Sequence, residues 1–294
     1  MQKLLIIAVA LIVAVACNKK TVDNPGFTVV TDKDTYKTTD TVFFSFGGNP
    51  WFLTFYSGEP YHKYEYHDRT TANGAPQLQF TSTVQTGPQA NTLRLFVSSD
   101  FSGTYDSASI YQATWTDITD KAKLATSTTS TASGIVDLTS FINNDHPVYF
   151  AFKYIGLAGS AQRNWTIKSV ALNNVLPDNT SYALLNISES TSGFKAVQMK
   201  TTTVSWSVSN SQFVIKGGTT TASQDAEDWL ISKPLTLNRV TPDAGVPLKN
   251  MTTAFPSYNY MYATPGTYNA TFVAANVSRY DDKENVVQIP VTVQ

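Results

Sequence analysis

The chain has 294 residues, with 21 lysines and arginines against 22 aspartates and glutamates, which gives a net charge of −1. Nothing in this balance favours nucleic acid, whose binding proteins show a basic patch or stripe, so we expect no nucleic acid as a partner. Only 15% of the residues are charged and 12% are aromatic, so Thr, Ser, Asn and Gln must supply most of the surface polarity, as is typical of β-proteins.

The first 16 residues have the features of an export signal. Lys3 gives a positive start, an uninterrupted apolar run occupies residues 4–15, and small residues precede a cysteine. The apolar run is shorter than the roughly 20 residues that a membrane-spanning helix needs. We therefore predict a cleaved signal peptide at residues 1–16.

Cys17 is the only cysteine of the chain, and it directly follows the small residues of the signal. This arrangement resembles a bacterial lipobox, although Ala14 stands where leucine is commoner. A lipobox implies that Cys17 is acylated, and two or more acyl chains anchor a protein stably to a membrane. Residues 17–26 are then the lipid anchor and tether. The alternative is a chance cysteine at the end of an ordinary signal peptide.

From residue 27 onwards, apolar residues recur at every second position, which is the period of a half-buried β-strand. Many such short runs, separated by turn-forming Gly, Pro, Asn and Asp, predict an all-β fold of sandwich or jelly-roll type. Pro290 predicts an edge position for the last strand, because proline cannot donate to a β-ladder. The rows predicted to share one face of a strand are Val42, Phe44 and Phe46; Leu93, Leu95 and Val97; Val148, Phe150, Phe152 and Tyr154; Tyr268, Ala270, Phe272 and Ala274; and Val287, Ile289, Val291 and Val293.

The two ends of the chain look like halves of one domain. Residues 258–272 contain the pattern Tyr-x-Tyr-x-x-Pro-Gly-x-Tyr, and with Val291-Thr292-Val293 they resemble the last strands of polycystic-kidney-disease (PKD) repeats. Residues 40–46 resemble the opening strand of that family. The resemblance implies an immunoglobulin/PKD-like sandwich made of residues 27–69 and 241–294. An inserted domain would separate the halves, since insertions are tolerated at exposed turns.

The predicted insert, residues 70–240, resembles the galactose-binding-like jelly rolls of cell-surface and choice-of-anchor proteins. The predicted architecture is therefore an immunoglobulin/PKD-like sandwich split by an inserted β jelly roll. Such jelly rolls frequently hold one structural Ca²⁺, which prefers oxygen ligands, so Asp100, Asp106 and Asp117 are candidate calcium ligands. No other cofactor is expected. The resembling segments are residues 95–103, 113–118, 134–138, 148–154, 165–167 and 228–235.

Residues 49–59 and 64–70 resemble a Bacteroidetes lipoprotein family catalogued as domain of unknown function 5017. The resemblance extends over most of the mature chain, and the family is linked to outer-membrane glycan uptake. It implies a lipoprotein at the cell surface that binds polysaccharide beside a transporter complex. Asn18-Lys19-Lys20 replaces the acidic run that often directs such lipoproteins to the outer face. The choice between the outer and periplasmic faces of the outer membrane therefore stays open.

Four aromatic residues are candidates for glycan binding, because sugar rings stack on flat aromatic surfaces while amides and hydroxyls bind their hydroxyl groups. Trp51 follows a Gly-Gly-Asn-Pro turn, Tyr61 and Tyr64 alternate with charged residues, and Trp115 lies near a predicted loop. The alternative is that each ring belongs to a core.

Catalytic motifs are absent from the sequence, which contains no nucleophile elbow, phosphate-binding loop or zinc motif. A glycosidase needs two carboxylates about 5 to 9.5 Å apart across a cleft. His62 and His67 invite a metal site with Glu65 and Asp68, but in an extended strand the two rings point to opposite faces. We therefore expect no enzyme. The acids that lie near aromatic residues are Glu59, Glu65, Asp68, Glu227 and Asp228.

Three functions stay open at this point. The first is a non-catalytic, surface glycan-binding lipoprotein of a polysaccharide-uptake system. The second is a structural or protein-interaction module of an outer-membrane complex, and the third is a secreted carbohydrate-active hydrolase or lyase. An exposed aromatic row would favour the first, whereas a large flat apolar patch would favour the second. Fold alone does not choose, since β-architectures of this kind carry many functions.

Overall fold

The computed structural model describes residues 21–85, 87–188, 193–200, 203–218 and 221–294. Regular structure in this part of the chain is almost entirely β-strand, with one short α-helix, α2 (Ser107–Gln112). The all-β prediction is confirmed. No helix among these residues is long and apolar enough to cross a bilayer. The predicted signal peptide and Cys17 lie outside the described residues.

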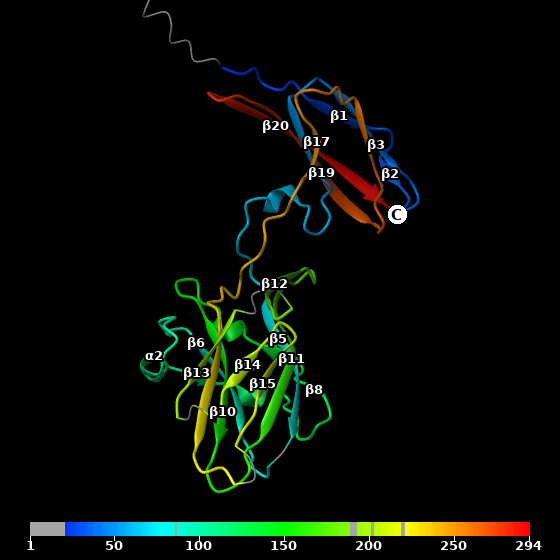
Figure 1. The fold of residues 1–294 in the computed structure, drawn as a ribbon. Helices are drawn as coiled ribbons and strands as arrows, with labels where there is room; N and C mark the ends of the chain where they lie inside the picture. The colour runs from blue at the N-terminus through cyan, green and yellow to red at the C-terminus, as the bar shows by residue number, and fades with distance from the viewer. Residues whose placement is uncertain (1–20, 86, 189–192, 201–202, 219–220) are drawn as a thin grey trace, which may run out of the picture. The chain divides into compact units, whose positions relative to one another are not determined.

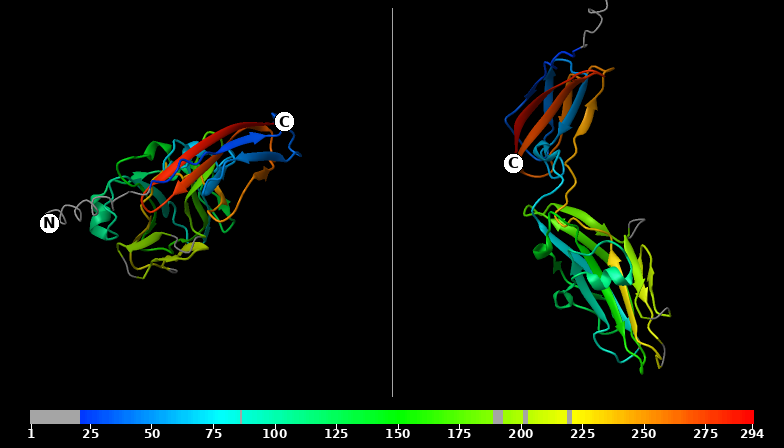
Figure 2. Two further views of the ribbon diagram at one scale, coloured as in Figure 1. Left: turned by 90° about the horizontal axis from the view of Figure 1, so that it is seen from above. Right: turned by 90° about the vertical axis from the view of Figure 1, so that its left-hand side faces the viewer.

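The chain divides into two compact units. Among the described residues, the first combines residues 21–69 with residues 242–294, and the second lies within the stretch 70–241. The second boundary lies one residue later than the sequence analysis placed it. In Figures 1 and 2, the blue N-terminal strands of the first unit lie among the orange and red C-terminal ones.

The first unit is a sandwich of two β-sheets. Each sheet combines strands from both ends of the chain, because β3 pairs with β18 in one sheet and β4 pairs with β19 in the other. The smaller sheet has the order β1 (Thr28–Thr31), β3 (Val42–Gly47) and β18 (Ser257–Tyr260). The larger sheet has the order β17 (Val246–Lys249), β4 (Phe52–Tyr56), β19 (Gly266–Val277), β20 (Asp282–Val293) and β2 (Thr35–Tyr36).

The core of the first unit is centred on the ring of Phe272. Its centroid lies 4.9 Å from that of Phe55, 5.0 Å from that of Phe44 and 5.2 Å from that of Phe46. Ala270 and Ala274, the next residues of β19 on the same face, are fully buried as well. The predicted row on β19 therefore faces inward, and the residues between point to the opposite face of the sheet, where Asn269 is exposed and Thr271 is buried.

Pro290 lies on β20, whose pairing with β2 includes only Thr292 and Val293. At Pro290 the strand pairs with β19 alone, so the missing N–H leaves no gap in a ladder. This is the edge position that the sequence predicted.

The second unit has two larger sheets that enclose one apolar core. The predicted rows that begin at Leu93 and Val148 both point into this core. One sheet has the order β13 (Phe194–Gln198), β16 (Ala226–Ser232), β10 (Tyr149–Gly156), β6 (Leu93–Ser98) and β7 (Thr116–Asp117). The other has the order β14 (Trp206–Val208), β15 (Gln212–Ile215), β11 (Asn164–Val175), β5 (Ala75–Gln85) and β8 (Thr131–Ala132), with β12 (Ser181–Asn186) paired to β11 and β9 (Val136–Asp137) paired to β5.

Candidate functional site

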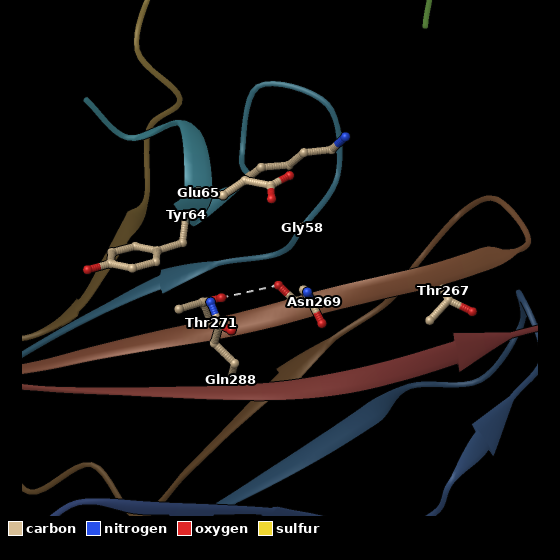
Figure 3. Close-up of a pocket in the computed structure, with 8 residues that line it drawn as sticks. Gly58, Tyr64, Glu65, Thr267, Asn269, Thr271 and Gln288 are labelled. Atoms are coloured by element: carbon tan, nitrogen blue, oxygen red, sulfur yellow. Dashed lines mark hydrogen bonds between the residues drawn. The ribbon is translucent and has the colours of Figure 1, made fainter. Parts of the chain in front are cut away.

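A polar groove of about 470 Å³ lies on the face of the larger sheet of the first unit that points away from the core. Its floor comes from three alternate residues of β19, namely Thr267, Asn269 and Thr271, and from Gln288 of β20. Its wall comes from the loop of residues 57–69, which follows β4 and contributes Gly58, Lys63, Tyr64 and Glu65. Figure 3 shows this loop above the two strands.

The polar floor follows from the period of β19. Ala270 and Phe272 point into the core, so Asn269 and Thr271 point the other way. Asn269 is exposed, and Thr271, which Gln288 faces across the ladder, donates its hydroxyl to the Asn269 carbonyl at 3.3 Å. This bond uses the backbone carbonyl of Asn269, so the Asn269 side-chain amide takes no part in it. A side-chain amide can both donate and accept hydrogen bonds.

Gly58 lets the wall of the groove approach its floor. Its φ is +84°, a left-handed conformation that favours glycine. A Cβ at this position would lie 2.8 Å from the backbone nitrogen of Asn269, closer than real Cβ contacts allow. The loop then turns back through a hydrogen bond of 2.9 Å from the Gly58 N–H to the carbonyl of His62.

The loop is held in place by Asp243, which comes 180 residues after Lys63 in the chain. The backbone N–H of Lys63 donates to the carboxylate of Asp243 at 2.9 Å, and Arg69 forms an ion pair with the same carboxylate at 3.5 Å. The guanidinium of Arg69 also lies 3.8 Å from the ring centroid of Tyr66. Because the side chain of Asp243 is only 1% exposed, this attachment is shielded from water.

Tyr64, in the 3₁₀ helix Tyr64–Tyr66, is the aromatic residue of the groove. Its ring stacks almost parallel on His67 with centroids 4.4 Å apart, and it meets Tyr56 edge-on at 5.4 Å. Burial raises the pKa of the Tyr64 hydroxyl, and the negative charges of Glu284 and Asp68 raise it further. The hydroxyl therefore stays protonated at neutral pH. In Figure 3 the ring lies over β19 beside Thr271.

The structure places only one of the four predicted glycan-binding residues in the groove, and that residue is Tyr64. Tyr61 is 44% exposed in the same loop but does not line the groove. Trp51 is half-buried just before β4, and so lies at the opposite end of that strand from Tyr56. The two groove amides, Asn269 and Gln288, were not among the predicted site residues, although the alternation of Asn269 with the apolar residues of β19 was visible in the sequence.

Trp115 belongs to the second unit and packs against the side of the β6–β10–β16 sheet that points away from the main core. Its indole N–H donates to the carbonyl of Ile110 at 3.0 Å, and its ring lies 4.9 Å from that of Trp229 and 5.5 Å from that of Phe101. These contacts hold the loop that contains α2 against the sheet, so Trp115 has a clear packing role.

The three candidate calcium ligands each have a local partner. Asp100 accepts from the Thr114 N–H at 2.8 Å, Asp106 caps α2 by accepting from the Ser109 N–H at 2.7 Å, and Asp117 pairs with Arg94 at 3.2 Å. Within the described ranges, no three or more His, Cys, Asp or Glu side chains gather where they could hold a metal ion. The calcium site stays a prediction, without a cluster of carboxylates in this part of the chain.

The five acids considered for catalysis are divided between the two units, with Glu59, Glu65 and Asp68 in the first and Glu227 and Asp228 in the second. Glu59 accepts from the Tyr260 hydroxyl at 2.6 Å, Asp68 pairs with His67 at 3.1 Å, and Glu227 pairs with Lys153 at 2.9 Å.

His62 and His67 are held by different carbonyls. The Nδ1 of His62 lies 2.6 Å from the oxygen of Ala244, and that of His67 lies 2.6 Å from the oxygen of Tyr64. The Nδ1 atom of each ring is therefore already hydrogen-bonded to a backbone carbonyl.

A family model described as a domain of unknown function (DUF5017) matches residues 16–194, more than half of the chain. The chain belongs to the DUF5017 family. The region matched in this DUF5017 protein includes the loop that carries Tyr64 and ends before β19 and β20, which form the groove floor. No curated protein and no solved structure matches the DUF5017 chain.

Proposed function

We propose that this protein is a non-catalytic glycan-binding protein and that the groove beside Tyr64 is its binding site. The observation that carries the proposal is the combination of an aromatic ring with the hydroxyl of Thr267 and the amides of Asn269 and Gln288 on one sheet. Its volume of about 470 Å³ lies within the usual range for small-ligand pockets.

The residues of the groove match what a sugar ring offers. A pyranose has C–H faces that pack on an aromatic ring, and its hydroxyl groups both donate and accept hydrogen bonds. Asn269 and Gln288 do the same through their amides, and Thr267 does so through its hydroxyl. Because these side chains stand on paired strands, their spacing is set by the sheet, and binding requires little ordering of the protein.

We further propose that the protein is an exported lipoprotein, anchored through Cys17 to the outer membrane at the cell surface. The apolar run before Cys17 and the polar residues after it support this location. A surface glycan-binding protein would act beside a transporter complex that imports the polysaccharide. The first unit would be an immunoglobulin/PKD-like sandwich and the second a galactose-binding-like jelly roll.

The test is affinity electrophoresis of the mature chain carrying Cys17→Ser, which removes the acylation site, through gels that contain different polysaccharides. We expect at least one polysaccharide to retard the protein. Asn269→Ala and Gln288→Ala should each weaken this retardation, because each removes a groove amide. A panel in which no polysaccharide retards the protein would reject the proposal.

A matched control is Asn259→Ala. Asn259 is exposed on β18, in the other sheet of the same unit, so the substitution is chemically identical but lies away from the groove. Retardation should survive Asn259→Ala. If both asparagine variants lose it equally, the groove is not the binding site.

The alternative function, a protein-interaction module, is favoured by exposed apolar residues on the smaller sheet of the first unit. Val30 on β1 is 63% exposed and Phe43 on β3 is 47% exposed. Single exposed apolar residues are common, whereas larger patches mark interfaces. Pull-down of membrane proteins with the wild-type chain and with Val30→Ser/Phe43→Ser would test this second function.

A further inference from the structure

We infer that the glycan bound in the groove is neutral, and that polysaccharides bearing uronate or sulfate groups are disfavoured there. This inference rests on the proposed glycan-binding function and deepens it, because the groove residues alone would accept any hydroxyl-rich polymer. The charges that surround the groove carry the argument.

Carboxylates outnumber free cations around the groove. Glu65 lines it directly. Glu284 on β20 and Asp68 in the loop lie close enough for their negative charges to act on the Tyr64 hydroxyl, and both also act on the hydroxyl of Tyr56. Three carboxylates therefore impose a negative potential on a ligand that lies against the Tyr64 ring.

The nearby cations offset only part of this charge. Lys63 lines the groove and balances one of the three carboxylates, while its ammonium lies 5.6 Å from the ring centroid of Tyr66. Arg69 is paired with the carboxylate of Asp243, which is almost completely buried. No arginine lines the groove, although a guanidinium is the group that binds a carboxylate or sulfate with two parallel hydrogen bonds.

The remaining groove groups suit an uncharged ligand. Thr267, Asn269 and Gln288 are neutral, and their side chains hydrogen-bond to hydroxyl groups without needing a compensating charge. An acidic sugar placed on them would bring its own negative charge near Glu65. Like charges brought together in an interface oppose binding and so reject the wrong partner.

The experiment compares neutral and anionic polymers in the same affinity gels at low ionic strength, where charge effects are strongest. The neutral probes are xylan, mannan, galactan and β-glucan, and the anionic probes are polygalacturonate, alginate and chondroitin sulfate. We expect a neutral probe to retard the Cys17→Ser chain, with every anionic probe at least about tenfold weaker in apparent affinity. Asn269→Ala should weaken the retardation by the neutral probe.

A second variant tests the cause of the selectivity. Glu65→Lys combined with Glu284→Lys reverses two of the three negative charges. It should increase retardation by polygalacturonate, and added salt should reduce that gain. A double variant that is folded but shows no gain would contradict the electrostatic explanation.

The failures of the two proposals differ. If an anionic probe binds best and Asn269→Ala abolishes its binding, the groove binds glycans but the inference of a neutral ligand is wrong. If no probe of either kind is retarded, or if retardation does not respond to Asn269→Ala, the proposed function of the groove is wrong and the inference falls with it.

Discussion

The backbone N–H of Lys63 donates a 2.9 Å hydrogen bond to the carboxylate of Asp243, 180 residues later in the chain. This bond joins the loop that forms the groove wall to the segment where the chain re-enters the first unit. The groove thus needs segments from both ends of the sequence. The wall comes from residues 57–69, whereas the floor on β19 and β20 and the carboxylate of Asp243 that holds the wall come from the C-terminal segment.

Asp243→Ala should destabilise the first unit and weaken glycan binding. Removing the carboxylate leaves the Lys63 N–H and the Arg69 guanidinium without this acceptor, and a lost buried hydrogen bond of this kind costs about 1–3 kcal/mol. Denaturant unfolding followed by circular dichroism measures the loss. Asp243→Asn keeps one acceptor oxygen and should recover part of it. A fully stable Asp243→Ala protein would show that the loop is held by other contacts.

Gly58→Ala should cost more than an alanine at a positive-φ glycine in open space. Both substitutions strain a left-handed backbone, by about 1–3 kcal/mol. At Gly58 the new Cβ would also press on the Asn269 backbone at 2.8 Å, so the loop must lift from the groove floor. Gly134→Ala is the control, since Gly134 has a φ of +73° and no atoms within 4 Å of an added Cβ. Affinity gels and thermal unfolding together separate the two effects.

Phe272→Ala should destabilise the first unit by about 3–5 kcal/mol, because it removes the ring on which four other phenylalanines pack and leaves a cavity. Val286→Ala, at a site 38% exposed on the paired strand β20, should change stability little. Scanning calorimetry of the two variants measures the difference. Equal stabilities would mean that the core can close around the lost ring.

Asp228 should make the second unit less stable as the pH rises from about 4 to 7. Burial raises the pKa of Asp228 from 3.8 to about 7, and the charge of Glu227 adds to the rise. Neither carboxylate oxygen has a hydrogen-bond partner among the described residues. The folded state therefore holds a proton that the unfolded state has released, so stability from this group is complete below pH 4 and lost by pH 7.

Asp228→Asn tests this directly because it cannot ionise. Its stability should be flatter across pH 4–7 than that of the wild type, and higher at pH 8 by a few kcal/mol at most. Urea unfolding followed by tryptophan fluorescence suits the experiment, since four of the five tryptophans lie in residues 70–241. An unchanged pH profile would mean that Asp228 has a partner in the folded protein.

Cys17→Ser should release the protein from membranes. Expressed in a bacterium with lipoprotein processing, the wild-type chain should incorporate labelled palmitate and sediment with the outer membrane, whereas the variant should do neither. One acyl chain gives only marginal binding and two or more give stable anchoring, so the change should be nearly complete. Membrane association that persists in the variant would place the anchor elsewhere.

The sequence by itself was sufficient to predict the all-β fold and the inward rows of several strands. Rows such as Phe150, Phe152 and Tyr154 repeat every two residues, and that period depends only on the local geometry of an extended backbone. The same alternation separates the inward Phe272 from the outward Asn269. Pro290 likewise indicated an edge, because its lack of an N–H is a property of the residue alone.

Only the tertiary structure decided which polar and aromatic residues meet. Tyr64 and Asn269 are far apart in sequence, and they line one groove because β4 pairs with β19 and Asp243 holds the loop between them. Trp51 and Trp115 had sequence surroundings as favourable as those of Tyr64, yet neither lines it. Alternation along a strand tells which face a residue takes, but strand pairing between distant segments determines its neighbours, and that depends on the whole fold.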